Sequence, residues 1–171
     1  LNGSNDPLLA SQWHYHNTGQ TGGTQGADIR LLDAWKTETG SKEVIIAVTD
    51  GGIQTDHPDL AANMWINEGE IAGNNIDDDN NGLVDDIHGY SFVDDSGTIN
   101  PNHHGTHVAG TIAAVNNNAE GVAGVAGGSG AGDGVRLMSC AVFSSAGSSG
   151  GFPDAYVYAA DNGAVISQNS W

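Results

Sequence analysis

A carboxylate and an imidazole stand at two points of this chain where they could share a proton. Asp50 ends the apolar run 44–49 and precedes two glycines, and His104 opens the segment His-Gly-Thr-His-Val-Ala-Gly at 104–110. A carboxylate that accepts the Nδ1 proton of an imidazole fixes its tautomer and leaves Nε2 free to take a proton from a hydroxyl. The pair therefore predicts an orienting acid and a general base. No convincing serine nucleophile follows them before residue 171.

The residues around both side chains predict the elements that would bring them together. Residues 44–49 are typical of a parallel strand that is covered on both faces. Such a strand would put Asp50 at the carboxyl edge of a sheet, where open α/β sheets bind ligands. Residues 104–115 are mostly small and apolar, and the asparagines that follow suit the end of a helix. Because a strand end and a neighbouring helix start can meet, we expect Asp50 to contact His104.

The rest of the chain extends this pattern to an α/β fold. Strands that alternate with helices favour a mainly parallel sheet with helices on both faces, which makes three layers. Residues 1–43 are polar and loop-rich and would form an N-terminal arm, and residues 67–88 are dominated by Asn, Asp and Gly and would form a long acidic loop. We expect further strands at 89–93, at 135–143 and from 164, and helices at 31–35 and 152–162.

The composition excludes several kinds of partner. The 171 residues suit one domain, and the 38% hydrophobic content argues against disorder. Only four Lys and Arg stand against 21 Asp and Glu, which gives a net charge of −17. We expect no binding to nucleic acid or to anionic membranes, because affinity for phosphates comes from cationic side chains. No run approaches the roughly 20 apolar residues of a membrane span, and the first residues lack the basic and apolar regions of a signal peptide.

An acidic segment at residues 77–86 predicts a calcium site. Oxygen-bearing side chains alternate along it before a glycine, as in the first half of an EF-hand loop. His88 stands where that loop has its bidentate Glu, so the helix–loop–helix version of the site fails. Five carboxylates within ten residues would repel one another without a cation, which favours calcium over an acidic turn that binds no metal. The candidate ligands are Asp77, Asp79, Asn81, the carbonyl oxygen of Leu83, Asp85, and Asp86 as a substitute for the missing Glu.

The two long motifs resemble those of the subtilisin-like serine proteases, or subtilases. Asp50, in the stretch that runs to Gln-Thr-Asp-His-Pro-Asp-Leu at 54–60, is similar to the family's Asp motif, and residues 104–113 are similar to its His motif. Gly51 departs from the Ser or Thr that the family usually has after the Asp. The resemblance covers nearly the whole chain as the N-terminal part of one catalytic domain, with thermitase- and kexin-like features, and it includes residues 5–8, 12–14, 121–126 and 165–171.

The resemblance implies a secreted, extracellular serine endopeptidase with a subtilisin-like sheet. Asp50 and His104 would supply two members of its triad. The nucleophilic Ser and the oxyanion Asn would belong to a C-terminal half, which we expect as a second chain that completes the sheet. A polypeptide substrate or inhibitor would pair with an extended segment and pack against a cleft wall. The residues implied for this binding are Ser149, Gly150, Gly151, Ser170 and Trp171.

The same resemblance implies a second calcium site near the N-terminus. Many subtilases hold calcium between the N-terminal arm, the Asp of the His-Pro-Asp-Leu segment and the loop after the catalytic helix. The matching positions are Asp6, Asp59, Asn117 and the backbone oxygens of Val115 and Val122.

Three other interpretations fit parts of the sequence. Residues 147–151 satisfy Gly-x-Ser-x-Gly, but hydrolases with that motif place a His after the Ser, and none follows Ser149. His103 and His107 share a helix face, but a zincin needs a Glu directly after the first His. An inert fragment, or a calcium- or peptide-binding module on a protease scaffold, would account for the acidic loop but not for the pairing of Asp50 with His104.

Overall fold

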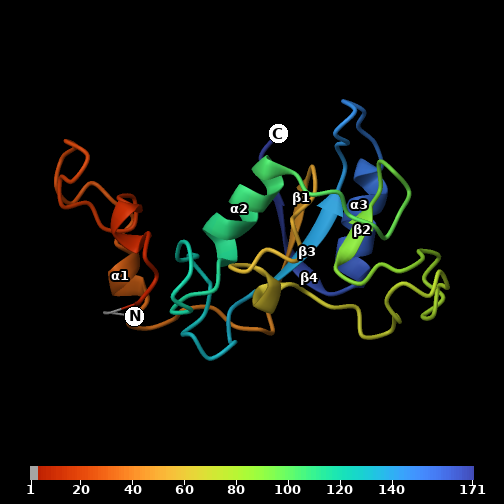
Figure 1. Ribbon diagram of the computed structural model, residues 1–171, viewed down its shortest axis with the longest axis horizontal. Helices are drawn as coiled ribbons and strands as arrows, with labels where there is room; N and C mark the ends of the chain where they lie inside the picture. Colours follow the sequence, from red (N-terminus) through yellow and green to blue (C-terminus); the bar gives the residue numbers. More distant parts are fainter. Residues whose placement is uncertain (1–3) are drawn as a thin grey trace.

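A four-stranded parallel sheet forms the centre of the computed structural model, which describes residues 4–171 (Figure 1). The strand order is β2-β3-β1-β4, and the three strand pairings are parallel. This confirms the predicted α/β fold with a mainly parallel sheet. The strands are β1 (Ile45–Asp50), β2 (Gly89–Ser91), β3 (Arg136–Ala141) and β4 (Ala164–Asn169).

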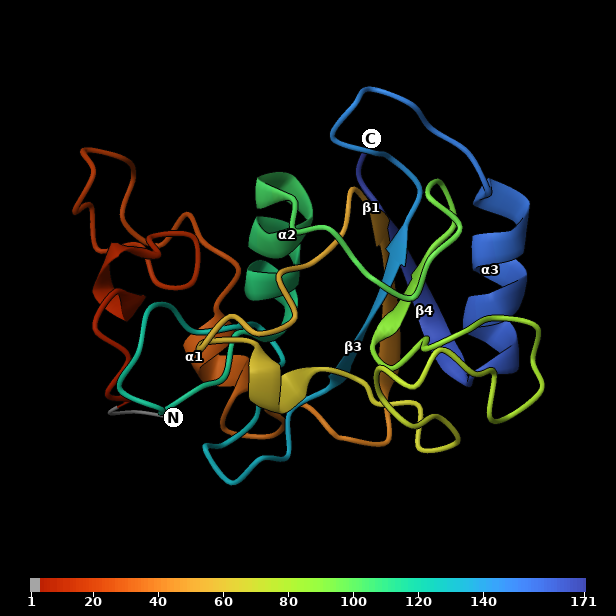
Figure 2. The same cartoon turned by 45° about the vertical axis from the view of Figure 1, so that its right-hand side comes forward.

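Two helices cover opposite faces of this sheet, α2 on one side and α3 on the other (Figure 2). The arrangement has the three predicted layers. None of the helices within residues 4–171 combines the length and the apolar composition needed to cross a bilayer. The helices are α1 (Leu31–Ala34), α2 (His103–Ala113) and α3 (Phe152–Asp161), with single 3₁₀ turns at Leu9–Ser11 and Ala61–Asn63.

The alternation of side chains along the strands builds one core on each face of the sheet. Val48 of β1 packs with Ala109 of α2 in one core. Ala47 lies in the other core, together with Cys140 of β3 and Ala155 of α3. Burial raises the pKa of the Cys140 thiol to about 12, so this cysteine is a core residue rather than a nucleophile. The small helical residues let both helices lie close to the strands.

The N-terminal arm lies beside α2, on the side away from the sheet (Figure 1). Tyr15 and Trp35 of the arm are buried together with Ala123, in the loop that follows α2. The Tyr15 hydroxyl donates to the carbonyl of Ala123 over 3.0 Å, and Nε1 of Trp35 donates to the carbonyl of Val125 over 2.8 Å. These contacts hold the arm against the loop that follows α2.

One edge of the sheet is formed by β4. The strand pairs with β1 on one side, and its apolar side chains are largely exposed, at 68% for Val165 and 50% for Ile166. An edge strand with exposed apolar residues is a template for pairing with further strands. A second chain that completes the sheet here remains a prediction.

Candidate active site

The structure brings Asp50 and His104 together at the carboxyl edge of the sheet. Nδ1 of His104 lies 2.8 Å from Oδ2 and 3.0 Å from Oδ1 of Asp50. The Asp50 side chain is only 5% exposed, whereas that of His104 is 49% exposed. The backbone N–H of Gly51 also donates to Asp50 Oδ1, over 2.7 Å. Since Nδ1 faces the carboxylate, Nε2 is the ring nitrogen left for proton transfer.

Asn102 fixes the start of the helix that presents His104. It is the N-cap residue of α2, and its Oδ1 accepts hydrogen bonds from the backbone N–H groups of His104 (2.8 Å) and Gly105 (3.4 Å). Such a cap satisfies backbone donors that have no partner within the helix. Helix α2 begins at His103, one residue before the predicted start at His104. An Asn before the apolar-periodic segment was the available signal for this boundary.

Two glycines allow the strand end and the helix start to approach each other. A Cβ atom at Gly105 would lie 2.5 Å from the carbonyl oxygen of Gly52. A Cβ atom at Gly51 would lie 2.6 Å from Nδ2 and 2.7 Å from Cγ of Asn102. The absence of a side chain at Gly105 therefore allows the short distance between Asp50 and His104, and Gly51 leaves room for the capping side chain of Asn102.

A pair of alanine substitutions in α2 tests this close approach. We expect Gly105→Ala to lower the free energy of unfolding by about 1–3 kcal/mol, because the methyl group would push α2 away from β1. Gly110→Ala is the matched control, since a Cβ there meets nothing within 4 Å. Replacing a helical glycine with alanine at an open position raises stability by about 0.5–1 kcal/mol. Equal effects of the two changes in denaturant unfolding would contradict the close approach.

The predicted peptide-binding segment 149–151 lies between β3 and α3. Ser149 forms an antiparallel bridge with Phe143, and the N–H of Gly150 donates to the carbonyl of Val142 over 3.0 Å. Gly151 is the N-cap of α3. Part of this segment's backbone is thus paired with the chain that continues from β3.

Ser170 and Trp171 follow directly on β4, and Trp171 lies next to the Asp50 strand. Its Nε1 donates to the carbonyl of Thr49 over 3.2 Å. The ring is 61% exposed and packs against Phe143 and Phe152, with centroid distances of 5.6 and 5.0 Å. An aromatic wall therefore connects β4, segment 149–151 and the edge of the sheet that carries Asp50.

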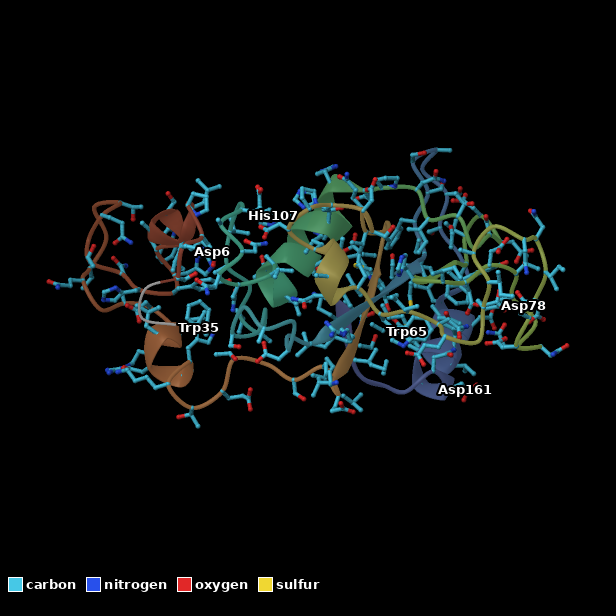
Figure 3. All side chains as sticks on the ribbon, turned by 60° about the horizontal axis from the view of Figure 1, so that its bottom comes forward. Asp6, Trp35, Trp65, Asp78, His107 and Asp161 are labelled. Atoms are coloured by element: carbon cyan, nitrogen blue, oxygen red, sulfur yellow. The ribbon has the colours of Figure 1, made fainter. Side chains whose placement is uncertain are left out.

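A group of three acids lies in the acidic loop, at the end of the molecule opposite Asp6 (Figure 3 labels Asp6 and the loop residue Asp78). Glu70, Asp77 and Asp79 each place a carboxylate oxygen within 4.8 Å of the others. The sequence predicted Asp77 and Asp79 as ligands and missed Glu70. Glu70 lies outside the 77–86 motif, and only the folding of the loop brings it there.

The other predicted ligands of this loop have different partners. The Asp85 carboxylate accepts the backbone N–H groups of residues 73–75, at 2.7 to 3.2 Å. Asp86 is fully buried and accepts side-chain donors from Asn67, Asn81 and Tyr158. The N–H of Leu83 donates to Oδ1 of Asn81 over 2.8 Å. Neither Asp85 nor Asp86 belongs to the three-acid group.

The three-acid group fits a hard cation. Glu70 is 9% exposed, and its oxygens accept backbone N–H groups from Asp78, Asp79 and Asp85. Within residues 4–171, both ion pairs made by Lys or Arg go to Asp33, so neither offsets the charge of this group. Carboxylate oxygens without a basic partner are the donor set that calcium prefers.

Two further acids, Asp6 and Asp59, lie where the N-terminal arm meets the loop after α2. Both are buried. Burial raises the pKa of the Asp59 carboxyl, and the nearby charge of Asp6 adds to the shift. Asn118 contacts both acids, through its N–H to Asp6 (3.2 Å) and its Nδ2 to Asp59 (2.9 Å). The backbone N–H of Asn117 donates to Oδ2 of Asp6 (2.9 Å), and that of Val122 donates to Oδ2 of Asp59 (2.9 Å). The N–H of Val115 donates to the backbone carbonyl of Asp59 (2.8 Å).

The comparison with protein families decides what kind of domain carries this site. The model of the subtilase family matches residues 41–171. The chain belongs to the subtilase family. The matched region contains Asp50, His104 and the acidic loop, and the family resemblance of the motifs is thereby confirmed.

Relatives from distant organisms share this subtilase region. Subtilisin-like protease 1 of Plasmodium falciparum (isolate 3D7) is 46% identical over 105 residues, which are 58% of this chain and 15% of the relative. Neuroendocrine convertase 2 of Bos taurus is 40% identical over 126 residues, which are 73% of this chain and 18% of the relative. The chain thus spans less than a fifth of these two relatives' lengths.

Solved bacterial structures share the fold. A serine protease of Aeromonas sobria superposes with a TM-score of 0.65 at 27% identity, covering 98% of this chain and 25% of that chain. A protease of Pseudoalteromonas arctica PAMC 21717 gives a TM-score of 0.53 at 32% identity, covering 89% of this chain and 42% of that chain. The subtilisin-like sheet is therefore shared with larger proteases.

Proposed function

We propose that this chain is the N-terminal part, residues 1–171, of one subtilase catalytic domain that hydrolyses peptide bonds through an Asp-His-Ser triad. The observation that carries the proposal is the contact of the buried Asp50 carboxylate with Nδ1 of the half-exposed His104. That geometry is the one required of an orienting acid and a general base. The family of the chain supports the same reaction.

In the proposed mechanism, this chain moves the proton and another part of the protein attacks the substrate. His104 Nε2 takes the proton of a serine hydroxyl, and the serine oxygen attacks the peptide carbonyl. Asp50 stabilises the imidazolium, which then gives its proton to the leaving amine. The acyl-enzyme that remains is hydrolysed in a second step.

The serine and the oxyanion Asn are proposed to come from a C-terminal half of the domain, present as a second chain. The exposed edge of β4 suits a C-terminal half that adds parallel strands, because these would cover Val165 and Ile166. A polypeptide substrate or inhibitor would pair with the backbone of 149–151 and pack against Ser170 and Trp171. We propose a secreted, extracellular protein, since the family resemblance implies one and the net charge of −17 suits it.

Calcium is proposed as the cation of the acidic loop and of the site at Asp6 and Asp59. Glu70, Asp77 and Asp79 would hold it in the loop. Asn81, the Leu83 carbonyl, Asp85 and Asp86 remain proposed neighbours or ligands there. The ion supplies charge neutralisation and therefore stability, and it takes no part in the proton transfers. The arm site would add Asn117 and the backbone oxygens of Val115 and Val122.

Labelling with a fluorophosphonate probe tests the proposal, because the probe reacts with an activated serine. In the full-length protein with all its chains, we expect one labelled serine that lies outside residues 1–171. A label on Ser149 or on another serine of this chain would contradict the assignment of the nucleophile. No label at all, with calcium binding retained, would favour a calcium- or peptide-binding module that lacks catalysis.

A further inference from the structure

We propose that Tyr158 is a positioning residue that couples the cation site of the acidic loop to the substrate-binding wall. This inference rests on the proposed function, because it concerns the regulation of the same site. The coupling runs from Asp79 through two asparagines to Asp86, and from Asp86 through Tyr158 to α3. No residue along it touches the reacting atoms.

The central link is a buried hydrogen bond between distant segments. The Tyr158 hydroxyl donates to Oδ2 of Asp86 over 2.6 Å, across a sequence separation of 72 residues. Asp86 is fully buried, and Tyr158 is 7% exposed. Burial raises the pKa of the Tyr158 hydroxyl, so the group stays protonated and remains a donor. A hydrogen bond to a buried carboxylate is strong and is costly to break.

Two amides join Asp86 to the three-acid group. Nδ2 of Asn67 donates both to Asp79 (2.9 Å) and to Asp86 (3.0 Å). Nδ2 of Asn81 makes the same two contacts, at 3.2 Å and 3.1 Å. The position of Asp79 therefore determines where both amides lie, and the amides determine where the Asp86 carboxylate lies.

A cation would act on this network through repulsion between the acids. Glu70, Asp77 and Asp79 repel one another when all three are charged. A bound cation holds Asp79 in place, and the amides then keep Asp86 aligned with Tyr158. When the cation leaves, Asp79 moves away from its neighbours, the two amides follow, and the Asp86–Tyr158 bond weakens.

The coupling reaches segment 149–151 and Trp171 through α3. The helix begins directly after segment 149–151, and its first residue, Phe152, packs against Trp171. A Cβ atom at Gly151 would collide with Phe92, and the Phe92 ring packs edge-on against Tyr158 at 5.5 Å. A shift of α3 would therefore move both the 149–151 segment and the aromatic wall at Trp171.

The test uses Tyr158→Phe in the full-length protein, because this change removes the hydroxyl and keeps the packed ring. Tyr90→Phe is the matched control: Tyr90 is also buried and also donates to a carboxylate, that of Asp95, at 3.0 Å. The first readout is amide hydrogen exchange of residues 150–158 in millimolar calcium and in excess chelator. Calorimetric titration with calcium alone reports whether the cation still binds.

In the wild type and in Tyr90→Phe, calcium is expected to slow exchange at 150–158. In Tyr158→Phe, this protection should fall by about 10- to 100-fold, the scale of one hydrogen bond to a charged group, while calcium still binds. The KM of a peptide substrate should become independent of calcium in this variant, with kcat unchanged. A purely structural role would lower the apparent kcat through loss of folded enzyme, and the KM would keep its dependence on calcium.

Two outcomes would overturn the coupling, and they are distinguishable. If Tyr158→Phe keeps the full calcium-dependent protection of 150–158, the coupling is wrong and the cation site stands. If the wild type binds no calcium in the titration, the proposed cation site fails and the coupling fails with it.

Discussion

Asp50→Asn is expected to lower the kcat of the full-length protein by about 10,000-fold. An Asn at this position keeps the shape of the side chain but loses the charge that stabilises the imidazolium. It also no longer fixes the tautomer through the 2.8 Å contact with His104 Nδ1. Substrate binding should change little, because Asp50 is buried and faces the imidazole. Steady-state kinetics on a peptide substrate would measure both constants.

His104→Ala should cost still more, about a millionfold in kcat, because it removes the base itself. The matched control is His107→Ala, one turn further along α2, where the side chain is exposed. We expect the control to keep nearly full activity and a similar stability. Comparable losses in the two alanine variants would show that the helix, rather than the imidazole at 104, was being tested.

Removal of calcium is expected to lower the melting temperature strongly. A ligand that binds only the folded state at a hundredfold excess over its Kd adds about 2.7 kcal/mol of stability. For a domain of this size, that corresponds to a loss of about 5–10 °C in excess chelator. Unchanged melting in chelator would contradict both proposed calcium sites.

Single substitutions would assign this effect to the acidic loop. Glu70→Gln should reduce the calcium-dependent part of the melting temperature, because Glu70 is one of the three clustered acids. Glu68→Gln is the control, since Glu68 is exposed, lies two residues away and is not in the group. Differential scanning calorimetry with and without calcium would separate the two variants.

The fold and the Asp–His contact could be predicted because their signals are local. The apolar run before Asp50 specifies a buried parallel strand, and the small residues after His104 specify a closely packed helix. A strand end and a helix start then bring the two side chains to one edge. The structure has both elements at nearly the predicted positions, as β1 and α2.

The acidic loop was harder to predict because its contacts are not set by spacing alone. An EF-hand pattern assigned Asp85 and Asp86 as ligands. In the structure, Asp85 accepts three backbone N–H groups and Asp86 accepts the Tyr158 hydroxyl from α3. Glu70 joins the acids from outside the motif. Such partners are chosen by how a long loop folds over its neighbours, which no short-range pattern records.

The contact between Gly51 and the N-cap Asn102 links the residue after the acid to the start of the helix that carries the base. A Ser or Thr after the acid, the usual family choice, would place its Cβ against the Asn102 side chain that caps α2. A larger residue at position 51 would therefore act on His104 indirectly, by displacing the side chain that caps the first turn of its helix.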